Sequence, residues 1–130
     1  RVGALLDTGN SLREPMTKHP VVVVEYTYIK PLLPAEVRAS IEKSGGFDVW
    51  EVLGSLSETR YASRFCAIPF HSLGEVKGLM LGFRPDWVAI EKQGRVIKAD
   101  KAVVAIYHEK LDPEGAYQAL LSHDLLQSVA

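Results

Sequence analysis

The 130-residue sequence has one cysteine, no long apolar run and no excess of charge of either sign. A lone cysteine, Cys66, excludes an internal disulfide and is compatible with a reducing compartment. The longest aliphatic stretch, Val21 to Val24, is far shorter than the roughly 20 residues of a membrane-spanning helix. The formal net charge of -1 argues against non-specific nucleic-acid binding, because such binding depends on a basic excess.

The sequence also lacks an initiator methionine and a signal peptide. Its composition, with 47% hydrophobic and 24% charged residues, is ordinary for a globular domain. We therefore expect residues 1–130 to form a single soluble domain cut from a longer protein.

Local patterns predict a mostly β domain with two helices. One helix is expected at residues 34–43, opened by a proline, and a second is expected from the Asp112-Pro113 start to residue 125. A Gln93-Gly94 turn predicts a hairpin. The expected strands are 2–6, 21–28, 60–70, 76–83, 87–90, 95–97 and 103–108.

The triplet Asp7-Thr8-Gly9 follows two leucines, as expected where a buried strand delivers a carboxylate to a cleft. Gly9 would allow a tight turn, and the Thr8 hydroxyl could fix the loop by bonding across a two-fold axis. We take Asp7 as the candidate catalytic residue and Thr8, Gly9 and Asn10 as its loop. The alternative is a structural turn without chemistry, since Asp and Gly are common turn residues.

A second block ends an apolar strand with Leu81, Gly82, Arg84 and Asp86. Aspartic proteases of the retroviral type place a similar strand end opposite the Asp-Thr-Gly loop. The longer spacing between the two blocks here could hold the helix at residues 34–43. A plain buried strand closed by a proline-containing turn is the competing interpretation.

Three ordered blocks, at residues 5–12, 68–74 and 78–86, together resemble the sporulation sigma-E factor processing peptidases. These are membrane-anchored aspartic proteases of endospore-forming bacteria. The resemblance covers the whole chain as their C-terminal protease domain. It implies a retropepsin-like closed β-barrel with one inserted helix and a C-terminal helix.

The resemblance also implies a homodimer that removes the pro-sequence of a sigma factor precursor. The missing N-terminal part would span the cell membrane, with this domain facing the mother-cell cytoplasm. A secreted signal protein is implied as activator.

Peptide hydrolysis by this route needs two carboxylates, and the chain holds only one Asp-Thr-Gly triplet. A two-fold dimer would place Asp7 opposite its own copy, so we expect an isolated monomer to be inactive. Asn10 stands where Ala or Ser is commoner, and its amide could tune the acid pair or merely support the turn.

Other readings of the sequence have less support. Gly45-Gly46 and Leu53-Gly54-Ser55 are alternative candidates for a substrate-covering flap. The histidines lack metal-ligand spacing, so we expect no metal and no other cofactor. Cys66 with His71 could form a nucleophile, but a buried thiol fits its apolar context better. The alternative function is a catalytically silent β-domain that binds a protein partner.

Overall fold

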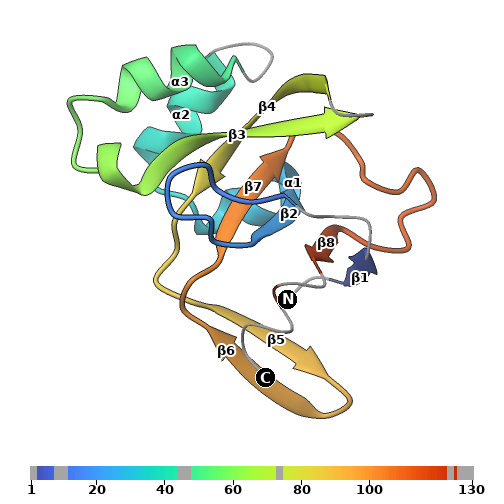
Figure 1. The fold of residues 1–130 in the computed structure, drawn as a ribbon. Helices are drawn as coiled ribbons and strands as arrows, with labels where there is room; N and C mark the ends of the chain where they lie inside the picture. The colour runs from blue at the N-terminus through green and yellow to red at the C-terminus, as the bar shows by residue number, and fades with distance from the viewer. Residues whose placement is uncertain (1–2, 8–11, 44–47, 73–74, 123–124, 126–130) are drawn as a thin grey trace.

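The computed structural model describes residues 3–7, 12–43, 48–72, 75–122 and 125 (Figure 1). Its described strands form a six-stranded sheet, in the order β1-β8-β2-β7-β4-β3, and a separate hairpin of β5 and β6. The strands are β1 (Ala4–Asp7), β2 (Val21–Glu25), β3 (Phe65–Ser72), β4 (Glu75–Phe83), β5 (Val88–Lys92), β6 (Arg95–Ala99), β7 (Val103–Tyr107) and β8 (Ala119–Ser122). The helical segments are α1 (Tyr26–Ile29), η1 (Lys30–Leu32), α2 (Ala35–Lys43), α3 (Val49–Leu56) and η2 (Ala62–Arg64).

The centre of the sheet is formed by β2 and β7, which pair in parallel. Every residue of β2 is buried, and so are the first four residues of β7. Continuous valine-rich runs are typical of strands covered on both faces. Val22 and Val24 belong to one hydrophobic cluster and Val21 and Val23 to another, so the sheet separates two cores.

Helices α2 and α3 pack on the first of these cores. Val37 and Ile41, four residues apart in α2, are buried, which confirms the predicted helix and its inner face. The sequence left residues 47–59 unassigned, and most of them form α3, capped by the Asp48 carboxylate, which accepts from the Glu51 N–H at 3.2 Å. The chain therefore has two inserted helices of this length where the sequence predicted one.

The expected closed barrel is wrong for the described part of the chain. The six-stranded sheet is open, with β1 at one edge and β3 at the other, and no described strand joins the two (Figure 1). The domain is mostly β with helices at one end, in partial agreement with the predicted fold class.

The expected C-terminal helix is also wrong over the described residues. The Asp112 carboxylate accepts from the N–H groups of Glu114 (3.2 Å) and Ala116 (2.8 Å), and Gly115 has a φ of +76°. These contacts build a turn, not a first helical turn. Ala119 to Ser122 then form β8, because an open position between β1 and β2 pairs their backbone.

The hairpin predicted around Gln93-Gly94 is confirmed. β5 and β6 pair antiparallel with Lys92 opposite Arg95, and Gln93 and Gly94 both have positive φ. Positive φ at both central residues is the geometry that two-residue hairpin turns favour. No helix formed by the described residues is long and apolar enough to cross a membrane.

Candidate active site

Asp7 is the last residue of β1, at the edge of the six-stranded sheet. Its backbone lies opposite Ser122 of β8. The predicted loop residues Thr8, Gly9 and Asn10 lie outside the described residues. The structure therefore supports the expectation that an apolar strand leads directly to Asp7, and it leaves the role of the side chain as a prediction.

The sequence gave no sign that β8 holds the active-site strand in place. β1 and β8 run parallel, and Ala4-Leu5-Leu6 lies residue for residue beside Ala119-Leu120-Leu121. The pairing is extended by the Gln118 N–H, which donates to the Gly3 carbonyl at 2.9 Å. Because β1 has no other described strand as neighbour, the position of Asp7 depends on this C-terminal strand.

Gly82, in the predicted opposing strand end, is required by its neighbours in β3. A Cβ at this position would lie 2.7 Å from the Cys66 Sγ and 2.7 Å from the Ile68 Cγ1. Such a contact is far shorter than the van der Waals distance. Leu81 beside it is 2% exposed and packs in the first core. In the sheet, β7, β2 and β8 stand between this strand and β1.

Arg84 leaves the end of β4 and pairs with Glu14, a residue that sequence reasoning missed. Its Nη2 lies 3.1 Å from the Glu14 Oε1, and the Glu14 side chain is only 1% exposed. The other carboxylate oxygen accepts from the Thr17 N–H at 2.7 Å and the Thr17 hydroxyl at 2.5 Å. Burial alone would raise the pKa of Glu14, but these hydrogen bonds and the Arg84 charge outweigh it, so the pKa lies below its ordinary value.

Glu14 lies in a tight turn that directly follows the predicted active-site loop. Its N–H donates to the His19 carbonyl at 3.0 Å, and its carbonyl accepts from the Lys18 N–H at 2.8 Å. The Val21 N–H donates to the Leu12 carbonyl at 3.3 Å, so the turn leads back into the central strand β2. The Arg84–Glu14 pair thereby ties the exit of residues 8–11 to the end of β4.

Asp86, the last of the predicted residues, lies on the surface. Its Oδ1 lies 2.9 Å from the Arg64 Nη2, and its side chain is 78% exposed. Arg64 also donates to the Arg84 carbonyl at 2.9 Å, and the Arg84 N–H donates to the Arg64 carbonyl at 2.7 Å. Arg84 and Asp86 thus join the end of β4 to the residues before β3, and within the described residues neither contacts β1.

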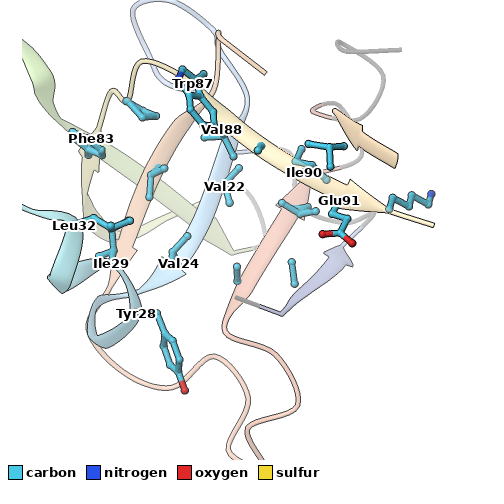
Figure 2. Close-up of a pocket in the computed structure, with 18 of the residues that line it drawn as sticks. Val22, Val24, Tyr28, Ile29, Leu32, Phe83, Trp87, Val88, Ile90 and Glu91 are labelled. Atoms are coloured by element: carbon cyan, nitrogen blue, oxygen red, sulfur yellow. The ribbon is translucent and has the colours of Figure 1, made fainter. Parts of the chain in front are cut away.

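An apolar groove of about 910 Å³ lies between the β5–β6 hairpin and the six-stranded sheet (Figure 2). Its floor includes Val22 and Val24 of β2, and its walls include Val88 and Ile90 of β5. Ala4 of the active-site strand also lines it. The sequence predicted the hairpin but not this groove, because no local pattern places a hairpin over a sheet.

The model of the family described as sporulation factor SpoIIGA, a peptidase family, matches residues 1–125. The chain belongs to this family. The resemblance drawn from the three sequence blocks is therefore confirmed.

Characterised members of the family are similar along almost the whole chain. The sporulation sigma-E factor-processing peptidase of Bacillus subtilis (strain 168) is 28% identical over 130 residues, which cover 99% of this chain and 41% of that protein. Its namesake in Priestia megaterium is 29% identical over 122 residues, covering 94% and 38%. The putative sporulation sigma factor-processing peptidase of Bacillus thuringiensis subsp. kurstaki is 25% identical over 128 residues, covering 98% and 76%.

The chain spans about two fifths of the length of the first two relatives. No solved structure matches the chain. The family is thus established by sequence alone.

Two further candidates in this peptidase domain can be placed. Leu53-Gly54-Ser55 lies within helix α3, so it forms no flap hairpin, whereas Gly45-Gly46 falls outside the described residues. Cys66 is half-buried, and burial raises the pKa of its thiol. An activated cysteine nucleophile needs a lowered pKa, so the alternative pairing with His71 has no support here.

Proposed function

We propose that this chain is the protease domain of a sigma-E factor-processing peptidase and that it works as an aspartic endopeptidase. The observation that carries the proposal is the single Asp-Thr-Gly triplet, reached by an apolar strand, in a chain that belongs to a peptidase family. The catalytic residue is Asp7.

The proposed chemistry needs two aspartates that share one proton. One carboxylate acts as general base on a water molecule, while the protonated one donates to the carbonyl oxygen of the scissile bond. Two carboxylates a few ångströms apart do not both ionise near neutral pH, so the pair supplies an acid and a base together.

A homodimer supplies the second aspartate in this proposal. β1 stands at the edge of the sheet, and among the described residues no strand pairs with its outer side. An isologous contact about a two-fold axis near this edge would bring Asp7 of one copy toward Asp7 of the other. The retropepsin-like arrangement would then be completed by two chains, each with an open sheet.

The substrate we propose is the inactive precursor of a sigma factor, from which the peptidase removes the pro-sequence. The relatives are named for processing sigma-E factor, and this chain aligns with them almost throughout. In the full-length protein we propose a membrane-spanning part before this domain, which then faces the mother-cell cytoplasm, and a secreted signal protein as activator.

Substitution of Asp7 tests the mechanism. Asp7→Asn keeps the size of the side chain but removes the ionisable group, so we expect cleavage of the precursor to fall by at least about 10³-fold. Folding and dimerisation, followed by circular dichroism and sedimentation, should be unchanged. Asp86→Asn is the matched control, because Asp86 is an exposed surface residue, and it should cleave at the normal rate.

Mixed dimers test the sharing of the site. A dimer of one normal chain and one Asp7→Asn chain should be inactive, because the acid pair needs both copies. If Asp7→Asn cleaves the precursor as fast as the unchanged chain, the aspartic mechanism is wrong, and a binding domain without catalysis becomes the better explanation.

A further inference from the structure

The proposed chemistry gives no role to the apolar groove under the β5–β6 hairpin. Its volume of about 910 Å³ lies near the upper end of the range for ligand sites, roughly 300–1,000 Å³. Large apolar side chains at its mouth are exposed: Leu32 by 77%, Val96 by 68% and Trp87 by 50%. Exposed apolar side chains gathered around one hollow indicate a binding surface.

The surroundings of the groove suit an extended polypeptide. Consecutive residues of the chain from Trp87 to Gln93 line it, so β5 borders it along the whole strand (Figure 2). Among the described residues, neither β5 nor β6 pairs with a strand outside the hairpin. An unpaired strand edge offers N–H and C=O groups to an added strand, while apolar hollows take its alternate side chains.

The charge of the hairpin favours an acidic occupant. Its two strands carry three basic side chains and one acidic one, all exposed: Lys92, Arg95, Lys98 and Glu91. Lys92 lines the groove, and the Lys98 Nζ lies 4.6 Å from the centre of the Trp87 ring. Carboxylates beside an apolar segment would therefore be attracted to both ends of β5.

The groove lies close to the active-site strand. Ala4 lines it, and Asp7 follows three residues later, about 10 Å along a strand with a rise of about 3.3 Å per residue. A segment bound in the groove would thus belong to the same substrate chain as a scissile bond at Asp7. Binding energy from such remote parts of a substrate is used to hold the reacting bond in place.

We infer that the groove binds an extended apolar segment of the protein substrate, flanked by acidic residues and outside the scissile bond. The inference rests on the proposed function, because it takes the occupant to be the substrate of that same site. Contact with this segment would let the peptidase select one folded precursor among proteins that carry similar cleavage sequences.

Binding is measured first, in the Asp7→Asn background, where the precursor is not cleaved. Leu32→Ser/Val96→Ser should raise the Kd for a fluorescently labelled precursor by at least about tenfold, because both side chains line the groove. Lys92→Glu/Arg95→Glu should raise it by about three- to tenfold, and less at high salt. Met16→Ser is the control, since Met16 is 84% exposed and lies outside the groove, and its Kd should stay within twofold.

Cleavage is measured next, with Asp7 in place. The groove variants should raise KM for the precursor by a similar factor and leave kcat within about twofold. A short peptide that spans only the scissile bond should be cleaved by these variants as by the unchanged chain.

Either of two results would overturn the inference: an unchanged Kd in the groove variants, or an equal loss for the precursor and the short peptide. Failure of the proposed function has a different signature, since cleavage would then not depend on Asp7 in any variant.

Discussion

Two ion pairs join the chain near the end of β4, and they differ in their surroundings much more than in their geometry. The N–O distances are 3.1 Å for Arg84–Glu14 and 2.9 Å for Arg64–Asp86. The two carboxylate side chains, however, are 1% and 78% exposed. Exposed pairs contribute about 0–1 kcal/mol, whereas breaking a buried pair costs about 3–5 kcal/mol. Burial, and not distance, therefore decides which of the two pairs matters.

The buried pair also spans more of the chain. Glu14 and Arg84 are 70 residues apart, and they connect the turn after the predicted active-site loop with the end of β4. The exposed pair only reinforces a corner that the backbone already closes, where Arg64 and Arg84 exchange hydrogen bonds. The comparison predicts effects on activity from the first pair alone.

The largest effect is expected for Arg84→Met. It leaves the Glu14 carboxylate buried with Thr17 as its remaining described side-chain partner, and it removes the hydrogen bond from the Arg84 Nη1 to the Ser63 carbonyl. We expect the free energy of unfolding to fall by about 3 kcal/mol, measured by urea denaturation. Cleavage should also fall at temperatures where the variant is folded, because the exit of the active-site loop loses its anchor.

The double variant Glu14→Gln/Arg84→Met separates a stranded charge from a lost contact. With no carboxylate left to bury, it should be more stable than Arg84→Met alone. If the double variant is as unstable as the sum of the two single variants, the pair is not coupled and the comparison fails.

Glu14→Gln alone is the next largest change, and its effect should depend on pH. The carboxylate accepts charge-assisted hydrogen bonds, so we expect a loss of about 1–3 kcal/mol at pH 7. Since the pKa of Glu14 is lowered in the folded chain, this stabilisation is present above the ordinary pKa of about 4.3. It is lost as the pH falls through the lower folded value.

Thermal denaturation at a series of pH values measures this dependence. The difference in Tm between the unchanged chain and Glu14→Gln should be largest near neutral pH and should shrink below about pH 4. A difference that stays constant down to pH 3 would show that Glu14 does not titrate with a lowered pKa.

The parts of the fold that the sequence predicted are those where local pattern and burial agree. The valine runs of β2 and β7 are buried in continuous stretches, as their composition indicates. The hairpin turn at Gln93-Gly94 and the Val37–Ile41 face of α2 rest on short-range rules that tertiary packing does not oppose.

The parts that the sequence missed depend on partners far along the chain. Ala119 to Leu121 continue an apolar stripe that suits a helix, but the place between β1 and β2 makes them a strand. Glu14, in a proline-containing turn, looks like a solvated charge until Arg84 is brought beside it. A dimeric acid pair is the extreme case, since the second Asp7 would lie in another chain.

The smallest effect is expected for Asp86→Ala, which removes the exposed pair while leaving the rest of the corner intact. Arg64 keeps its hydrogen bond to the Arg84 carbonyl, and the Arg84 N–H keeps its bond to the Arg64 carbonyl. The free energy of unfolding should change by less than about 1 kcal/mol, and the change should vanish in high salt, where exposed charges are screened. Cleavage of the precursor should be unaffected. A loss of activity in Asp86→Ala comparable to that of Arg84→Met would mean that the exposed pair also supports the active site, and that burial alone does not separate the two.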